Sequence, residues 1–276
     1  MNKYVFECQN DNIRLSEELK THVSKKFYKN IKSTNAKILV NDIEIPTYKE
    51  IKKGDKITIF YEKKKEINWP LYYHDFDILF EDDNYLVVNK RSGLLSIPTK
   101  GCPYSLYQEV MYYLKNKNSN DNVSILNRLD KETCGLVVIA KNRLAAYKLE
   151  PTHEHMIRKY YALCEGIFEK REGKIETYIE KDLNSNKRYV SNTGKIAITN
   201  YKVIKEYDNK SLVEFVLETG RTHQIRVHSS YLNHPIIGDT LYGNFKDDNL
   251  HLCSYYVEFL NPFSGKIVKC ELDSRW

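Results

Sequence analysis

Long apolar runs are missing from this sequence of 276 residues, although hydrophobic residues make up 41% of it. No stretch approaches the roughly 18 consecutive apolar residues that a membrane-spanning helix needs, so we expect no association with a membrane. The first twelve residues, MNKYVFECQNDN, lack the apolar core of a secretory signal peptide, which favours a cytoplasmic location. Charged residues make up 29%, as is usual for a soluble globular protein.

Paired cysteines of the kind that hold zinc are also missing. The six cysteines are scattered along the chain, and no two stand in a Cys-x-x-Cys arrangement. This pattern argues against a zinc site and is typical of reduced thiols in the cytoplasm. His153 and His155 could serve as metal ligands, but without partnering cysteines we expect no metal site there.

Positive charge is concentrated near the N-terminus. Residues 1–66 contain 15 Lys and Arg against 10 Asp and Glu, whereas the rest of the chain contains 28 against 27. Such a concentration favours a polyanionic partner such as nucleic acid, and a solvated lysine-rich surface is the alternative. Lys25, Lys29 and Lys32 share one face of a predicted helical region that contains no acidic residue.

The sequence divides into a small N-terminal part and a larger C-terminal part. Residues 1–62 combine an apolar helical stripe, which includes Leu15 and Leu19, with short strands separated by turns, so they predict a small α/β domain. A linker follows at 63–76. In 77–276, strand-like runs follow one another with few helices between them. We therefore predict an α+β fold whose C-terminal domain is built on a large mixed, mostly antiparallel sheet with flanking helices.

One polar patch interrupts an otherwise apolar stretch, in the sequence Leu-Asn-Arg-Leu-Asp-Lys-Glu-Thr-Cys-Gly at 126–135. Asp130 stands just ahead of a glycine and a fully apolar strand, so its carboxylate is expected at the mouth of a sheet, where functional sites tend to lie. Arg128 could orient a phosphate or pair with this carboxylate. The alternative is a loop aspartate that only caps the turn through Thr133.

A second polar stretch, Leu-Glu-Thr-Gly-Arg-Thr-His-Gln-Ile-Arg-Val-His, occupies 217–228. The pattern predicts a strand that ends near Gly-Arg and leads into a helix. Arg221 stands where the exposed end of that strand would present its side chain. Arg226 and His223 could be buried structural hydrogen-bond donors, and a structural role is favoured for His223 and His228.

These stretches resemble the signatures of the RluA-type RNA pseudouridine synthase family. The family's His-Arg-Leu-Asp-x-x-Thr-Ser-Gly-Leu signature is matched at 127–136, and Thr-Gly-Arg-Thr-His-Gln-Ile-Arg-Val-His occurs without change at 219–228. His-Pro-Ile-x-Gly-Asp-x-x-Tyr-Gly follows at 234–243, and the opening Glu-Asp-Asp-Asn-Tyr-Leu-Val-Val-Asn-Lys stands at 81–90. Four separate motifs in the right order make the resemblance highly specific.

Three positions depart from the family pattern. Asn127 stands where the family usually has His, Cys134 where it usually has Ser, and Arg91 where Pro is common. None of these departures removes a catalytic group, but they leave the subfamily open, and with it the RNA site. The strand Arg-Lys-Tyr-Tyr-Ala-Leu at 158–163 also matches, so the resemblance spans most of the C-terminal domain.

The N-terminal domain carries a second resemblance. Residues 12–61, with KILVNDIEI and IKKGDKITI as their most telling parts, are similar to the alpha-L RNA-binding motif shared with a small-subunit ribosomal protein. The resemblance implies that basic helices, here with Lys25, Lys29 and Lys32, grip an RNA backbone. The alternative is a small basic domain that only packs on its neighbour.

The family resemblance implies isomerisation of uridine to its carbon-linked isomer within ribosomal or transfer RNA, without a metal or redox cofactor. We expect a monomer, although the sequence does not give the oligomeric state. Asp130 would attack the anomeric carbon or remove the 2′ proton, and the sequence leaves both open. Arg221 would pair with Asp130 and keep it ionised. Tyr160 would lie against the uracil face and could relay the proton from carbon 5. Arg128 would help to fill the gap left by the flipped-out uridine.

Two other functions fit parts of the sequence. A non-catalytic RNA-binding protein would keep the basic N-terminal domain, but it has no use for the pair of Asp130 and Arg221. A hydrolase that releases free base would need a second carboxylate. Glu132 is the nearest candidate, and its position on the flank of the loop is a poor placement. We therefore predict the synthase.

Overall fold

The computed structural model describes most of the chain, in the ranges 2–23, 28, 31, 36–61, 69–99, 101–102, 104–117, 123–149, 156–245 and 247–273. It forms two compact units, Met1–Asn68 and Trp69–Trp276, and each has its own apolar core. Some residues singled out from the sequence lie outside the described residues: Lys25, Lys29, Lys32, His153 and His155. No helix within the described ranges is long and apolar enough to cross a membrane.

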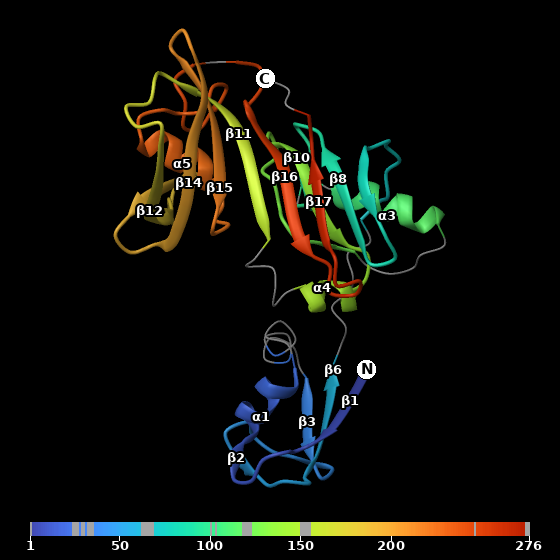
Figure 1. The fold of residues 1–276 in the computed structure, drawn as a ribbon. Coiled ribbons are helices and arrows are strands. Elements are labelled where there is room, and N and C mark those ends of the chain that lie inside the picture. The colour runs from blue at the N-terminus through green and yellow to red at the C-terminus, as the bar shows by residue number, and fades with distance from the viewer. Residues whose placement is uncertain are drawn as a thin grey trace. The chain divides into compact units, whose positions relative to one another are not determined.

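The N-terminal unit packs a helix, α1 (Leu15–His22), against a small antiparallel sheet (Figure 1). The sheet has the order β1-β6-β3-β4, and a two-stranded pair β2-β5 completes the unit. The strands are β1 Asn2–Glu7, β2 Ile13–Arg14, β3 Lys37–Val40, β4 Ile43–Glu44, β5 Glu50–Ile51 and β6 Lys56–Tyr61. Alternation along β3 and β6 buries one face against Leu15 and Leu19 of the helix.

The C-terminal unit is built on one large sheet with the order β13-β12-β14-β15-β11-β16-β10-β8-β7. The strands are β7 Ile78–Glu81, β8 Tyr85–Lys90, β10 Cys134–Ala140, β11 Ile157–Glu165, β12 Glu172–Lys181, β13 Arg188–Ser191, β14 Lys195–Tyr207, β15 Lys210–Leu217 and β16 Leu252–Leu260. Two further strands join it, β9 (Ser124–Ile125) on β10 and β17 (Ile267–Glu271) on β16. The predicted α+β fold with a mixed, mostly antiparallel sheet is confirmed.

Within the described residues, the helices that flank this sheet are α3 (Leu106–Asn116), α4 (Arg143–Leu149) and α5 (Gln224–Tyr231). The two faces of β8 and β10 enter different apolar clusters, since Leu86 and Val88 pack with α3 whereas Tyr85 and Val87 pack with α4. Burial on both faces explains why these strands are continuous apolar runs in the sequence rather than alternating ones.

A short parallel joint connects β10 with β16 and thereby sets the place of the loop before β10. Only two pairs form it, Cys134 with Cys253 and Gly135 with Ser254. Gly135 has φ +111°, and a Cβ there would lie 2.2 Å from the carbonyl oxygen of Ser254, so the close approach requires glycine. β11 is the other neighbour of β16, so β16 lies between β10 and β11 (Figure 1).

Candidate active site

A cavity of about 1170 Å³ lies in the C-terminal unit, where the loop before β10, strand β11 and the start of α5 meet. Its lining includes four residues predicted from the sequence: Arg128, Asp130, Tyr160 and Arg221. Segments that lie far apart in the chain thus meet at one place, although the four side chains take different positions within it.

The loop that presents Asp130 is fixed through its backbone. The hydroxyl of Ser96 donates to the carbonyl oxygen of Leu129 at 2.7 Å and accepts from its N–H at 3.0 Å. Lys90 is fully buried and its Nζ donates to the carbonyl oxygen of Lys131 at 3.1 Å, besides two other carbonyls. Burial lowers the pKa of Lys90 to about 8. These bonds hold the residues on both sides of Asp130 and leave its side chain free for other contacts.

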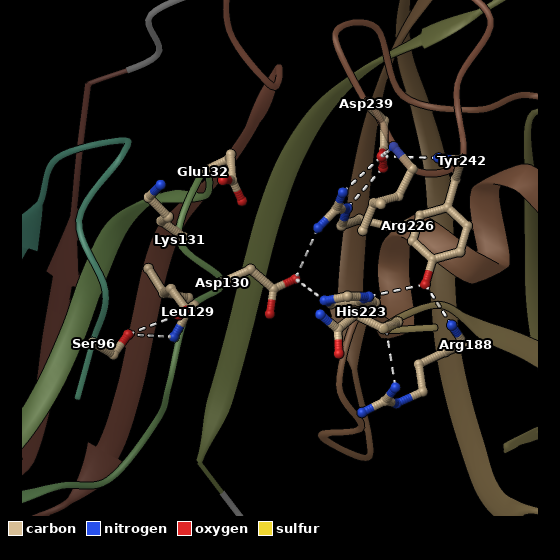
Figure 2. A network of polar contacts seen from close by, with 12 residues as sticks. Ser96, Leu129, Asp130, Lys131, Glu132, Arg188, His223, Arg226, Asp239 and Tyr242 are labelled. Carbon is tan, nitrogen blue, oxygen red and sulfur yellow. Dashed lines mark hydrogen bonds and ion pairs between the residues drawn. The ribbon is translucent and has the colours of Figure 1, made fainter. Parts of the chain in front are cut away.

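The carboxylate of Asp130 does not cap its own turn. The N–H of Thr133 donates to the backbone carbonyl of Asp130 at 3.2 Å, whereas the side chain points across the cavity towards α5 (Figure 2). The side chain is 26% exposed, so it is open to a substrate. The interpretation of Asp130 as a mere turn cap is therefore not supported.

The cation that faces Asp130 is Arg226, in the first turn of α5. Its Nη1 lies 3.5 Å from Oδ2 of Asp130 (Figure 2). Its Nε and Nη2 donate to the two carboxylate oxygens of Asp239, each at 2.7 Å. Asp239 has no exposed side-chain surface, and it also accepts from the N–H groups of Leu241 and Tyr242. A bidentate pair of this kind fixes the plane of a guanidinium, so Arg226 is aimed at Asp130.

His223 contacts Asp130 from the same side. Its Nε2 lies 3.9 Å from Oδ2 of Asp130, and its Nδ1 forms a hydrogen bond of 2.9 Å with the hydroxyl of Tyr242. Burial lowers the pKa of His223, although Asp130 opposes this shift. A guanidinium stays protonated in proteins, so Arg226 is the permanently charged partner of Asp130.

The predicted ion pair between Arg221 and Asp130 is wrong. Nε of Arg221 donates instead to the carbonyl oxygen of Ile196 on β14, at 2.8 Å. The reason is local, because His223 adopts a left-handed conformation with φ 58° and the helix begins only at Gln224. This turn leaves Arg221 at the end of the sheet and directs Arg226 at the carboxylate.

Tyr160 and Arg128 differ in burial. Tyr160 is only 5% exposed and lies in the wall of the cavity, where burial raises the pKa of its hydroxyl. That hydroxyl therefore keeps its proton at neutral pH and can donate it. Arg128 is exposed at the lining of the same cavity, where its charge remains accessible to RNA.

Two important residues were missed or undervalued from the sequence. The sequence suggests only a structural donor role for Arg226, and it assigns no role to Asp239. Both belong to the matched stretches at 219–228 and 234–243, so the signal was present in the pattern. Spacing alone could not tell which of two arginines in one motif faces Asp130. Among the described residues, no group of three or more His, Cys, Asp or Glu side chains is arranged to hold a metal ion.

Comparison with known proteins identifies the family of this chain. The family model described as RNA pseudouridylate synthase matches residues 84–231, more than half of the chain. The chain belongs to the RluA-type RNA pseudouridine synthases. It is therefore an isomerase, as the sequence predicted. The basic N-terminal unit lies outside the matched range.

Several synthases are similar over most of their length. An uncharacterised RNA pseudouridine synthase of Bacillus subtilis, YhcT, is 36% identical over 246 residues, which cover 86% of this chain and 82% of that protein. The ribosomal large subunit pseudouridine synthase D of Buchnera aphidicola is 34% identical over 249 residues, covering 82% and 78%. The solved structure of human RNA pseudouridylate synthase domain containing 1 shares the fold, with a TM-score of 0.62, 22% identity and coverage of 74% and 86%.

Proposed function

We propose that this synthase acts on large-subunit ribosomal RNA, with Asp130 as the catalytic carboxylate and Arg226 as its charged partner. The observation that carries the assignment is the accessible carboxylate of Asp130 facing a guanidinium that a buried Asp239 holds in place. The substrate rests on relatives such as the synthase of Buchnera aphidicola, whose name specifies the large ribosomal subunit. A ribosomal substrate also favours a cytoplasmic location, and transfer RNA is the second candidate.

The carboxylate can act at the sugar of the target uridine. Asp130 either attacks the anomeric carbon or removes the 2′ proton, and both steps need an ionised carboxylate that the substrate can reach. With a 3.5 Å contact to Arg226 and 26% exposure of its side chain, Asp130 keeps lone pairs for the sugar. Glu132 stays on the flank of the same loop, so a second carboxylate for hydrolysis is not opposed to Asp130 (Figure 2).

Tyr160 and Arg128 complete the proposed mechanism. Tyr160 offers an aromatic face to the uracil, and its hydroxyl relays a proton from carbon 5 only if it passes its own proton on in the same step, with the former glycosidic nitrogen as the final acceptor. Arg128 is exposed at the cavity and suits the gap that a flipped-out nucleotide leaves in the RNA.

Replacing Asp130 tests the assignment. Asp130→Asn keeps the shape and removes the charge, so we expect no detectable pseudouridine while folding and RNA affinity survive. The measurement is tritium release from RNA that contains 5-tritiated uridine. Mapping pseudouridine in ribosomal and transfer RNA from cells with and without the gene identifies the substrate. Product formation by the Asn variant would overturn the role of Asp130.

For the N-terminal unit we propose a role in gripping RNA backbone through residues 12–61. The support is the charge pattern and the alpha-L resemblance, and Lys25, Lys29 and Lys32 remain its predicted contacts. Each phosphate contact lowers log K by roughly 0.7 to 0.9 per tenfold rise in salt. A chain that begins at Leu71 should therefore bind RNA more weakly and with a shallower salt slope.

The salt dependence distinguishes this role from simple packing. At saturating RNA the shortened chain should keep its single-turnover rate, because the unit contributes affinity and not chemistry. Replacing Lys25, Lys29 and Lys32 together by Gln should reproduce much of the affinity loss. Parallel salt slopes for the full and shortened chains would instead assign the unit a purely structural role.

A further inference from the structure

Arg158 is a buried cation of the cavity wall that the mechanism above leaves without a role. It lies on β11 two residues before Tyr160, on the same face of the strand, and is 7% exposed. Among the described residues, no carboxylate oxygen comes within 4.0 Å of its nitrogens. Its Nε is buried and has no hydrogen-bond partner in the part of the chain that the structure describes.

A buried guanidinium nitrogen without a hydrogen-bond partner lowers the stability of a folded protein. A buried ionised group is normally paired, because neither water nor a partner otherwise replaces its lost hydration. The neighbouring Arg226 shows the usual solution, a bidentate bond with a buried carboxylate. Within the described residues Arg158 has no such carboxylate, and it lines the cavity, so an acceptor brought by the substrate would complete its hydrogen bonds.

We propose that Arg158 binds the carbonyl oxygens of the target uracil and stabilises the negative charge on the base when the glycosidic bond breaks. This inference rests on the proposed function. Residues two apart on a strand are about 7 Å apart, comparable to the width of a pyrimidine with its oxygens. A base whose face lies on Tyr160 therefore presents its edge to Arg158. RNA phosphates follow the outside of the RNA, where exposed Arg128 is the better placed cation.

The charge arises in either form of the reaction. When the bond between the anomeric carbon and the ring nitrogen breaks, its electron pair stays with the uracil and spreads over both carbonyl oxygens. This holds whether Asp130 attacks the sugar or removes the 2′ proton. After the base turns, carbon 5 bonds to the sugar and releases its proton, while the former glycosidic nitrogen takes one up. Nothing is oxidised or reduced.

A guanidinium suits this task because it stays protonated and carries five N–H donors in a planar fork. As the uracil turns, either carbonyl oxygen can meet a donor without movement of the protein. Donors fixed in advance at a developing charge lower the barrier by electrostatic stabilisation. Arg158 would thus stabilise the base, while Arg226 faces the carboxylate.

Replacing Arg158 gives the direct test. Arg158→Met should lower the single-turnover rate by at least about a hundredfold, comparable to the loss of one preorganised donor, while the dissociation constant for RNA and its salt slope stay unchanged. Arg158→Lys should restore only part of the rate, because the charge remains without the fork. Arg171→Met, which removes an exposed arginine outside the cavity, is the matched control and should leave the rate unchanged.

Gly220 offers a second test that keeps the charge. A Cβ at this position would lie 3.1 Å from Nη1 of Arg158, with no other atom within 4 Å. Gly220→Ala should therefore shift the guanidinium slightly and lower the rate about tenfold, the effect of roughly 1.4 kcal/mol. In the Arg158→Met background it should have no further effect. This variant keeps the question testable if Arg158→Met does not fold.

A uracil that leaves more easily distinguishes a catalytic role of Arg158 from a purely structural one. Fluorine at carbon 5 withdraws electrons and stabilises the uracil anion, so bond breaking in 5-fluorouridine RNA should suffer less from Arg158→Met than in uridine RNA. Equal losses for both RNAs would overturn the inference, and so would weaker binding with a shallower salt slope at an unchanged rate, which would mark a phosphate contact. Wild-type protein without activity would instead reject the proposed function itself.

Discussion

Arg226 contacts two aspartates that lie in opposite environments. Asp239 has no exposed side-chain surface, holds Nε and Nη2 at 2.7 Å and accepts two backbone N–H bonds. Asp130 is 26% exposed and meets the same guanidinium at 3.5 Å. The difference shows how one guanidinium can have two roles. The saturated, buried carboxylate fixes the arginine, and the loosely held, accessible one remains available for chemistry.

The largest effect on stability is expected from a change at Asp239. Asp239→Asn leaves Arg226 buried with a weakened partner, and disrupting such a pair typically costs about 3–5 kcal/mol of stability. Asp130→Asn should cost less than about 1 kcal/mol, because the pair is partly exposed. Urea unfolding of the two variants and the wild type measures the contrast. Equal losses would show that the two aspartates do not differ in this way.

The pH dependence of the unfolding free energy tests how Lys90 holds the Asp130 loop. Its pKa falls from 10.5 to about 8 on burial, so between these values only the unfolded chain binds the proton. Stability therefore rises with pH in this interval, by at most about 1.4 kcal/mol per unit. Relative to Lys90→Met, the wild type should gain about 1–3 kcal/mol in unfolding free energy from pH 8 to 10.

The same variant should also slow the reaction, because the hydrogen bond to the carbonyl of Lys131 is lost. A relative stability that stays constant or falls over this pH range would contradict the lowered pKa. Buffers of equal ionic strength serve as the control for screening of other charges.

The smallest effect is expected at Arg221. Arg221→Met removes one hydrogen bond to the carbonyl of Ile196, which is worth about 1 kcal/mol. The single-turnover rate should stay within about fivefold of the wild type, the factor that 1 kcal/mol represents. A hundredfold fall would return the role of charged partner to Arg221 and reject the pairing of Arg226.

The sequence predicted the carboxylate better than its partner. Asp130 could be found because it lies between a polar patch and an apolar strand, within a specific motif. Arg226 could not be chosen over Arg221, because spacing alone does not predict the left-handed conformation of His223. Its buried partner, Asp239, comes from a different motif, and their pairing is visible only in three dimensions.

The fold shows a similar division. The class of the sheet followed from the order of strand-like runs, since alternation is a local property. Strand β12 was not predicted. Its buried residues Ile175 and Ile179 stand four apart, a spacing that a strand and a helix share. The parallel pairing of β10 with β16 could not be predicted from the sequence either, because it depends on a close backbone approach between Gly135 and Ser254.

That joint makes the site a late product of folding. The pairing of β10 with β16 closes a loop on the order of 120 residues. The conformational entropy lost on closing this loop opposes folding until the contacts between the strands have formed. β16 lies between β10 and β11, so the nascent chain must extend through Leu260 before the carboxylate of Asp130 can meet Tyr160 in the finished sheet. During synthesis on the ribosome, the N-terminal unit is available for folding long before a catalytic centre exists.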